Sequence, residues 1–160
     1  MKQKVFIKYH SPSSRLANIP KGDWIDLRAA AAVEAKKGDF KLISLGVSMD
    51  LPPGCEAIVA PRSSSPINYG FIVPNSIGVI DNSYRGTSDV WKCPALFFTD
   101  GKINKGDRIC QFRIQLSQKA TVWQKLKWLF SDGFEFIEVD YLQEEDRGGF
   151  GSTGRSIVTC

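Results

Sequence analysis

The chain has 160 residues, 42% of them hydrophobic and 24% charged, proportions typical of one soluble globular domain with a substantial core. Its formal net charge of +4 is compatible with an anionic substrate but too small to indicate binding to nucleic acid or to a membrane. The basic group Lys119, Lys125 and Lys127 is interpreted as solvated surface.

The four cysteines contain no Cys-x-x-Cys pair, and the single histidine lies far from them in sequence. Buried free thiols in a reducing compartment are therefore expected, and a zinc site is not. No apolar run approaches membrane-spanning length, and the first residues lack the hydrophobic region of a signal peptide. These features predict a cytoplasmic protein that contacts neither membrane nor nucleic acid.

The chain begins with a short strand, predicted at 5–9 from its apolar and β-branched residues. Loop-forming residues dominate 11–23, and a second strand-like run occupies 24–28. The small-residue run at 29–32 is compatible with a helix by propensity or with a tightly packed strand.

Further strands are predicted from alternation of apolar and polar residues, at 43–47, 56–60, 90–98 and in the segment that follows 107. Turn-forming sequences are found at 36–39, 51–54 and 104–107. Pro94 inside its predicted strand indicates an edge or a bulge. In the last strand one face collects the apolar side chains of Cys110, Phe112, Ile114 and Leu116.

Many short strands without an internal repeat or a βαβ rhythm predict an all-β fold, a jelly-roll-like barrel or sandwich with little helix. We expect one β domain over 1–143, followed by a flexible Gly-rich arm over 144–160. Residues 118–143 form an insertion, predicted as a short helix or hairpin with a strand over 134–139. Its tryptophans Trp123 and Trp128 fit a patch for a protein partner or, preferably, a satellite hydrophobic cluster.

The densest group of candidate functional residues lies between 60 and 86. Arg62, Ser63 and Ser64 precede Ser65-Pro66, a sequence typical of a capped helix start. Hydroxyls and an arginine fork beside such a turn can bind phosphate. The alternative is a capped helix with a surface arginine.

A hairpin is predicted at 75–81, where the Asn75 amide could pair with a base and Gly78 would let a ring approach the backbone. Asp81 ends what reads as a buried strand and could activate a water, or it could simply cap the following turn. Tyr84 could stack on a sugar and exclude an extra hydroxyl by sterics.

The C-terminal segment combines Phe150, which offers a stacking face, with Arg147, Ser152 and Thr153, which can donate to phosphate oxygens. It contains no Walker A sequence. A disordered terminus is the alternative interpretation.

Taken in order, these motifs resemble those of the homotrimeric dUTPase family over residues 22–117 and 144–154. The five matching segments are 24–30, 60–64, 78–86, 105–112 and 147–154. The resemblance implies a β jelly roll that trimerises, with active sites at subunit interfaces. It implies hydrolysis of dUTP to dUMP and pyrophosphate with Mg²⁺ on the triphosphate, which keeps uracil out of DNA and supplies dUMP for dTMP synthesis.

By the same resemblance, Asp81 is the general base that activates water at the α-phosphorus, and Tyr84 packs under the deoxyribose. Asp26 acts indirectly, near the water shell of the metal. The residues implied to read uracil are Asn75, Gly78, Val79, Ile80 and Phe150. Those implied to hold the rest of the substrate, mainly its phosphates, are Arg62, Ser63, Ser64, Gln111, Arg147, Gly151, Ser152 and Thr153.

The chain departs from the common family pattern at several points. Trp24 and Ser64 stand where glycine is usual, and Ser83 stands where a second aspartate is frequent. The arm is shorter, the segment before it is longer, and 87–89 lengthens the strand after the third motif.

Two alternatives to a dUTPase remain open from the sequence. A dCTP deaminase would share the fold and the phosphate turn but should lack the Gly-rich arm. A non-catalytic nucleotide-sensing or protein-binding module would keep the fold and use residues 119–143 for a partner.

Overall fold

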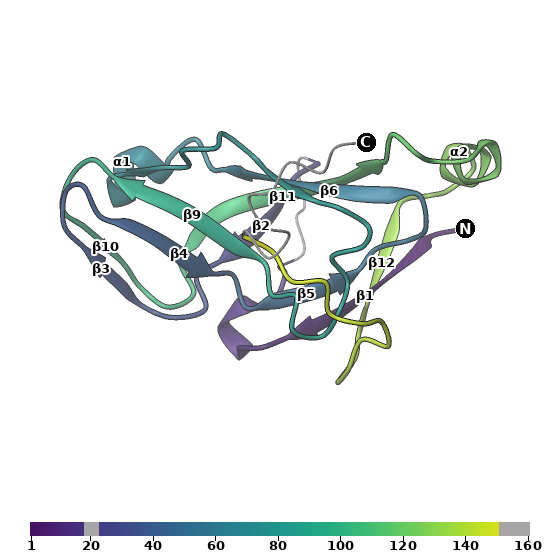
Figure 1. Ribbon diagram of the computed structural model, residues 1–160, viewed down its shortest axis with the longest axis horizontal. Helices are drawn as coiled ribbons and strands as arrows, with labels where there is room; N and C mark the ends of the chain where they lie inside the picture. The colour runs from purple at the N-terminus through teal and green to yellow at the C-terminus, as the bar shows by residue number, and fades with distance from the viewer. Residues whose placement is uncertain (18–22, 151–160) are drawn as a thin grey trace, which may run out of the picture.

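The computed structural model describes residues 1–17 and 23–150 and is built almost entirely from short strands (Figure 1). The elements, in order, are β1 Gln3–Tyr9, the 3₁₀ turn η1 Pro12–Ser14, β2 Ile25–Arg28, β3 Val33–Ala35, β4 Phe40–Ser44, β5 Val47–Asp50, β6 Cys55–Pro61, α1 Ser65–Tyr69, β7 Phe71–Ile72, β8 Gly78–Ile80, β9 Lys92–Phe97, β10 Gly101–Ile103, β11 Arg108–Leu116, α2 Val122–Leu129 and β12 Phe134–Glu138. The all-β prediction is confirmed. None of the helices in the described residues is long and apolar enough to cross a membrane.

The strands form small sheets that pack as a sandwich rather than a closed barrel. The largest has the order β2-β11-β6-β8, and its central pair β11 and β6 runs along the molecule in Figure 1. The others have the orders β12-β1-β5, β4-β9-β7 and β10-β3. Strand β8 is therefore an edge strand, hydrogen-bonded to β6 alone within its sheet.

Aromatic side chains fill the space between the sheets. Trp91 packs edge-on against Phe112 with ring centroids 5.3 Å apart, and both are completely buried. The predicted alternation along β11 is confirmed, because Cys110, Phe112 and Ile114 are buried while Arg113 is exposed. This core fixes β6 and β11, the strands that carry or adjoin the candidate site.

Three predictions about local structure need correction. Residues 29–32 are neither helix nor strand, with bends at 30 and 31; the backbone N–H of Ala29 donates to the Asp107 carbonyl and that of Ala30 to the Ser44 carbonyl, so neither forms a helical bond. The run 43–47 is divided between β4 and β5 at Gly46, whose φ of 65° breaks the strand.

The third correction concerns Pro94, which lies in the middle strand of its sheet. Strand β7 pairs only with Leu96 and Phe97 of β9, so no ladder partner faces Pro94 on that side. The proline is tolerated because β7 is so short, which gives this stretch of β9 a local edge.

Residues 118–143 contain α2 and β12, so the helix, one of the two predicted alternatives, is present, and the predicted strand over 134–139 is found. A capping box between Thr121 and Gln124 begins the helix, and β12 adds to β1 in parallel. Trp128 packs on Phe134 with ring centroids 5.5 Å apart, and both lie against the main core, so this tryptophan extends the core and does not form a separate satellite cluster. Trp123 is 81% exposed and takes no part in this packing.

Candidate active site

The predicted base, sugar and arm residues lie around one cavity of about 280 Å³, which we call the nucleoside pocket. Eight of the predicted residues line it: Asn75, Gly78, Val79, Ile80, Asp81, Tyr84, Arg147 and Phe150. The remaining lining residues are Val59, Lys92, Pro94, Gly148 and Gly149.

Strand β8 forms one wall of the nucleoside pocket, but not as part of a hairpin. Strand β7 before it pairs with β9, whereas β8 pairs with β6, so the loop at 73–77 connects two different sheets. The predicted hairpin is therefore wrong. Val79 is 59% exposed, so Asp81 does not follow a buried strand either. Both features leave the outer edge of β8 open toward the pocket.

Asp81 is held by the turn that it caps. Its Oδ1 accepts a hydrogen bond from the Ser83 backbone N–H at 2.8 Å and one from the Ser83 hydroxyl at 2.5 Å. These two bonds lower the pKa of Asp81, and the nearby positive charges of Arg147 and Lys119 act in the same direction. Among the described residues no donor reaches Oδ2, so the ionised carboxylate keeps one oxygen free for a water. Turn capping and water activation are thus compatible.

Tyr84 forms another wall of the nucleoside pocket. Its hydroxyl donates to the Val90 carbonyl at 3.1 Å, and burial raises the pKa of the phenol. A side chain at Gly149 would crowd the ring, because an added Cβ would lie 3.2 Å from it. Lys92 completes this region, with its ammonium 5.5 Å from the centre of the Phe150 ring.

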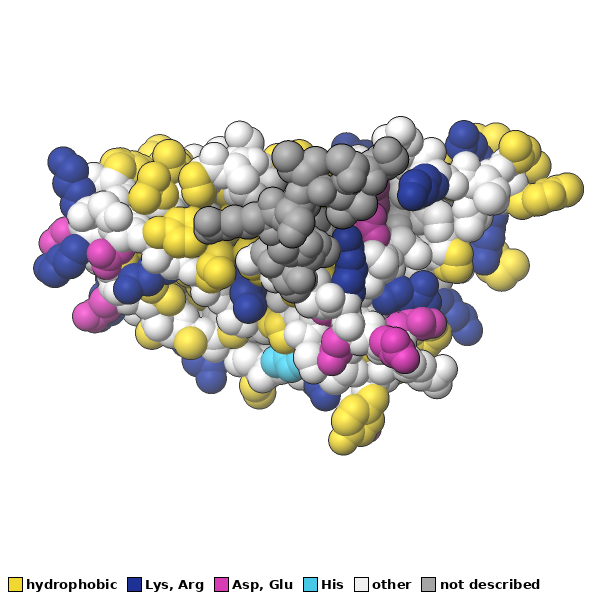
Figure 2. Space-filling model, viewed as in Figure 1, with side chains coloured by type: hydrophobic (Ala, Val, Ile, Leu, Met, Phe, Trp, Pro, Cys, Tyr) yellow, Lys and Arg dark blue, Asp and Glu magenta, His cyan; other side chains and the backbone are white. Residues whose placement is uncertain are grey.

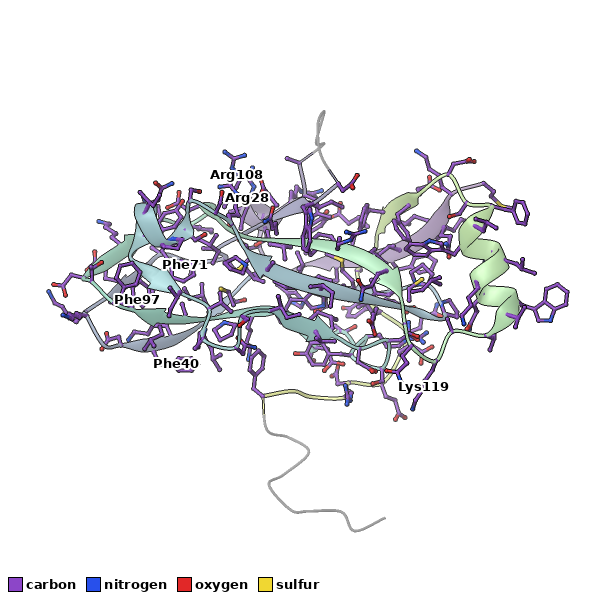
Figure 3. The ribbon with its side chains drawn as sticks, turned by 90° about the horizontal axis from the view of Figure 1, so that it is seen from above. Arg28, Phe40, Phe71, Phe97, Arg108 and Lys119 are labelled. Atoms are coloured by element: carbon purple, nitrogen blue, oxygen red, sulfur yellow. The ribbon has the colours of Figure 1, made fainter. Side chains whose placement is uncertain are left out.

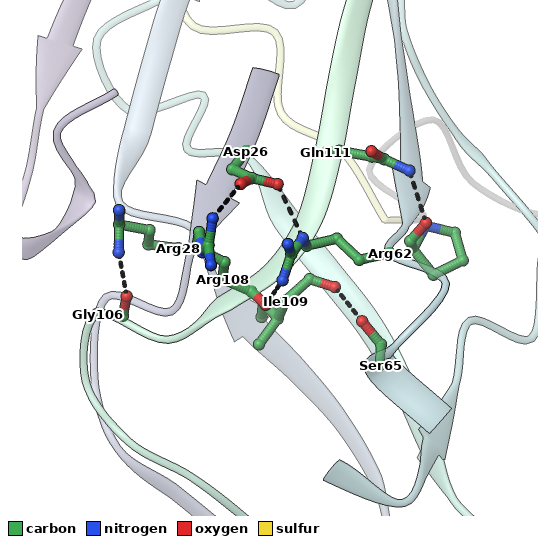
Figure 4. Close-up of polar contacts among 9 residues, drawn as sticks. Asp26, Arg28, Arg62, Ser65, Gly106, Arg108, Ile109 and Gln111 are labelled. Carbon is green, nitrogen blue, oxygen red and sulfur yellow. Dashed lines mark hydrogen bonds and ion pairs between the residues drawn. The ribbon is translucent and has the colours of Figure 1, made fainter. Parts of the chain in front are cut away.

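The predicted phosphate turn, residues 62–64, lies outside the nucleoside pocket. Figure 4 shows that its arginine and the neighbouring strands are joined by polar contacts within the chain. Arg62 Nε pairs with Asp26 Oδ1 at 2.8 Å, and Arg108 pairs with Asp26 Oδ2 at 3.1 Å. Gln111 donates to the Pro61 carbonyl at 3.2 Å. Asp26 therefore orients Arg62 through a direct ion pair, a contact that the sequence did not reveal.

Helix α1 follows this turn, as predicted, but Ser64 does not cap it. The Ser64 backbone is already helical and its side chain accepts no capping hydrogen bond. The Ser65 hydroxyl donates instead to the Ile109 carbonyl at 2.8 Å and is buried. Ser63 is exposed. The hydroxyls of Ser63 and Ser64 are therefore not engaged in a helix cap.

The nucleoside pocket and the phosphate turn lie on different sides of the chain. A wide groove of about 1020 Å³ adjoins the pocket at Asp81 and Arg147 and is also lined by Lys119. Figure 3 shows Lys119 at one long edge of the molecule and Arg108, which pairs with Asp26, at the other. The predicted site is therefore brought together only in part within one chain.

Some predicted residues remain without a structural account. Gly151, Ser152 and Thr153 lie outside the described residues. Within the described ranges no group of three His, Cys, Asp or Glu side chains is arranged to hold a metal ion. A metal bound mainly through substrate phosphates and water needs no such group, so the indirect role of Asp26 stays a prediction.

Sequence reasoning missed three residues beside the nucleoside pocket. Lys92 and Lys119 gave no signal beyond their charge, and Lys119 was assigned to solvated surface. Asp89 is a buried carboxylate whose partners are backbone N–H groups. Its only sequence signal was its place in the lengthened segment 87–89.

Comparisons with known proteins decide the family. The dUTPase family model matches residues 24–126. The chain belongs to the dUTPase family. It is 50% identical over 152 residues to the SPbeta prophage-derived deoxyuridine 5'-triphosphate nucleotidohydrolase of Bacillus subtilis, covering 94% of this chain and 98% of that protein. The corresponding enzyme of Finegoldia magna is 33% identical over 160 residues, covering 96% and 99%.

Solved dUTPase structures share the fold. The dUTPase of Streptococcus mutans superposes with a TM-score of 0.62 at 23% identity, covering 71% of this chain and 93% of that one. The dUTPase of phage phi11 of Staphylococcus aureus, described with a structural Mg(II) ion, has a TM-score of 0.62 at 16% identity and covers 74% and 94%. The jelly-roll-like prediction is confirmed, and the family match favours dUTP hydrolysis over the deaminase alternative.

Proposed function

We propose that this dUTPase binds the uracil and deoxyribose of dUTP in the nucleoside pocket, and that Asp81 activates the water that splits dUTP into dUMP and pyrophosphate. The observation that carries the proposal is the convergence of Asp81, Tyr84 and the open edge of β8 on one cavity of about 280 Å³. The names of the relatives in Bacillus subtilis and Finegoldia magna support the same substrate.

Uracil recognition is assigned to the backbone of β8. As an edge strand, β8 has peptide groups on its outer side that no neighbouring strand of its sheet uses. The flat edge of uracil alternates carbonyl oxygens with an N–H, so it can pair with such a backbone much as a strand would. Asn75 supplies an amide at the same wall, and Phe150 supplies a stacking face.

The chemical step is a water attack on the α-phosphorus. The ionised Asp81 takes a proton from the water as oxygen bonds to phosphorus, and the bond to the bridging oxygen breaks to release pyrophosphate. The two Ser83 hydrogen bonds hold Oδ1 of Asp81. They therefore fix the orientation of the carboxylate and leave Oδ2 free to accept the proton of the water. Mg²⁺ bound mainly by phosphate oxygens and water would neutralise the phosphate charge; a Mg(II) ion, described as structural, is reported for a variant of the phage phi11 enzyme.

The phosphate ligands are proposed to reach the nucleoside pocket from another subunit of a homotrimer. Arg62, Ser63, Ser64 and Gln111 do not line the pocket of their own chain. The ion pair with Asp26 keeps the Arg62 guanidinium oriented, as an arginine that must meet an incoming phosphate requires. From the arm, Arg147, Gly151, Ser152 and Thr153 are proposed to complete the grip. The arm, 144–160, and the β domain, 1–143, remain the proposed division of the chain.

Pyrophosphate release from dUTP with Mg²⁺, measured beside dCTP, dTTP and UTP, tests the function. We expect release from dUTP alone, because the nucleoside pocket is lined for uracil and deoxyribose. Ammonia from dCTP would overturn the proposal in favour of a deaminase. No product from any of the four would favour a nucleotide sensor.

A protein-binding role is a second candidate, supported by the exposed apolar side of α2 (Figure 2). Val122, Trp123, Leu129 and Phe130 are each more than two thirds exposed there. A photo-crosslinking residue in place of Trp123 should give protein adducts in cells that a residue in place of Lys36 does not. Equal labelling at both positions would exclude a specific surface. The cytoplasmic location stays a prediction.

A further inference from the structure

Asp89 is a carboxylate buried beside the nucleoside pocket, with 2% of its surface exposed. Its partners are three backbone N–H groups: Oδ2 accepts from Gly86 at 3.0 Å and from Arg147 at 2.8 Å, and Oδ1 accepts from Gly148 at 2.8 Å. A buried carboxylate is stable only when such donors replace its lost water. Here two of the three donors belong to a segment almost sixty residues further along the chain.

Neighbouring contacts bring that segment alongside the loop containing Asp89. Thr87 Oγ1 donates to the Leu142 carbonyl at 3.1 Å and accepts from the Leu142 N–H at 2.8 Å. Asp146 Oδ1 accepts from the Ser88 N–H at 2.6 Å. These contacts end at Asp146. Among the described residues, Asp89 is the acceptor for the backbone N–H groups of both Arg147 and Gly148.

These hydrogen bonds to Asp89 determine where the side chains of Arg147 and Phe150 lie. With the Arg147 backbone fixed, its guanidinium lies 3.9 Å from Asp81 Oδ1. Gly149 then packs on the Tyr84 ring, and Phe150 reaches the nucleoside pocket beside Lys92. The backbone has a positive φ at Gly148, 73°, and at Phe150, 53°. Positive φ is unfavourable for a phenylalanine, so contacts elsewhere in the segment must hold this conformation.

We infer that Asp89 is a positioning residue, which fixes the root of the C-terminal arm so that Arg147 and Phe150 are placed at the nucleoside pocket. The inference rests on the substrate roles proposed for these two residues. Asp89 itself does not line the pocket and contacts no reacting atom. Its effect on catalysis would pass entirely through the arm.

The substitution Asp89→Asn tests this with little change of shape. An asparagine keeps one acceptor oxygen, but its NH₂ must face a backbone N–H that also donates. At least one bond to the arm root is therefore lost. Asp100→Asn is the matched control, because Asp100 also accepts a backbone N–H, from Lys37 at 2.9 Å, but lies outside the nucleoside pocket.

Limited trypsin digestion measures how firmly Asp89 holds the backbone of Arg147 and Gly148, and it does so without relying on activity. The bond after Arg147 is a trypsin site whose backbone Asp89 holds in the folded protein. We expect Asp89→Asn to accelerate cleavage there by about tenfold, as loss of a charge-assisted bond favours local opening. Asp100→Asn should leave the rate unchanged. An unchanged cleavage rate in Asp89→Asn would overturn the inference.

A double-mutant cycle then separates positioning from general destabilisation. We expect kcat/KM for dUTP to fall about tenfold in Asp89→Asn, and to fall clearly less than tenfold when Asp89→Asn is added to Arg147→Ala, because only the displacement of Phe150 then remains to be felt. Equal losses in both backgrounds would show a merely structural role and overturn the inference. If Arg147→Ala alone has no effect, the proposed role of Arg147 fails, and the cycle is decided with Phe150→Ala.

Gly148→Pro removes a hydrogen bond between Asp89 and the arm from the side of the arm. It is a second variant in case Asp89→Asn folds poorly. Proline has no N–H, so the hydrogen bond that Asp89 accepts from Gly148 is lost, and proline cannot adopt the positive φ of Gly148. It lies beyond the last strand, so the β domain should keep its melting temperature. Trypsin does not cleave an Arg–Pro bond, so opening of the arm is measured in this variant by chymotrypsin cleavage after Phe150. We expect faster cleavage there than in the wild type and a loss of kcat/KM similar to that of Asp89→Asn. Wild-type values for both would overturn the inference.

Discussion

The nucleoside pocket and the phosphate turn differ in how complete they are within one chain. Around the pocket, β8, the Asp81–Ser83 turn and residues 147–150 converge, and Asp81 keeps a free oxygen. At the phosphate turn, Arg62 is already paired with Asp26, and no predicted nucleoside ligand is near.

The two regions are nevertheless close in sequence, because β6 leads into the phosphate turn and also pairs with β8. The chain turns away after Pro61 and returns only at Gly78, so the regions emerge on different sides. An enzyme whose active site is assembled between subunits requires two things of each chain. One is a formed nucleoside pocket, and the other is an arginine that is oriented but lies outside that pocket, as Arg62 does. This difference supports the proposal that the active site is divided between subunits.

The largest effect is expected from Asp81→Asn. We expect kcat to fall by about 10³-fold, because an amide cannot take the proton from the attacking water. Binding of a non-hydrolysable dUTP analogue should persist, since the wall of β8 and Tyr84 are untouched. Asp140→Asn serves as an exposed control. Near-normal turnover in Asp81→Asn would remove Asp81 as the base.

Arg62→Ala tests the other region and the division between them. We expect kcat/KM to fall by about 10²-fold, because the arginine's charge-assisted bonds to phosphate are lost. Co-expressing Arg62→Ala with Asp81→Asn should restore part of the activity if each site combines residues of two subunits. Absence of recovery in verified mixed oligomers would place both residues in one subunit's site.

The sequence predicted the pocket better than the path of the chain that forms it. Asp81, Tyr84 and Phe150 were identifiable because their chemistry is tied to the residue type. The false hairpin at 75–81 arose because turn residues show that the chain bends, but not which sheet each side joins. Asp89 was overlooked because its partners are backbone N–H groups, which every residue carries and no sequence pattern displays.

Tyr84→Ala sharpens the description of the nucleoside pocket at its sugar wall. We expect the preference for dUTP over UTP to fall by about tenfold, because the ring would no longer exclude a 2'-hydroxyl and a hydrophobic wall discriminates only modestly. Tyr84→Phe is the matched control, since it keeps the ring and loses only the bond to Val90. An unchanged preference in Tyr84→Ala would contradict the stacking role.

The smallest effect concerns the pH dependence set by Ser83, the serine that stands where the family frequently has an aspartate. The base must be ionised, so activity should be lost as pH falls through the pKa of Asp81, which the Ser83 hydrogen bonds hold below its usual 3.8. Ser83→Ala removes the hydroxyl bond but keeps the backbone bond, so the acid limb of kcat/KM should move up toward 3.8 while the rate near neutral pH changes little. Short assays at low pH, with folding monitored by circular dichroism, measure this shift. An acid limb that stays in place would show that the backbone N–H alone sets the pKa, and that serine at this position matters for the shape of the turn rather than for the charge of the base.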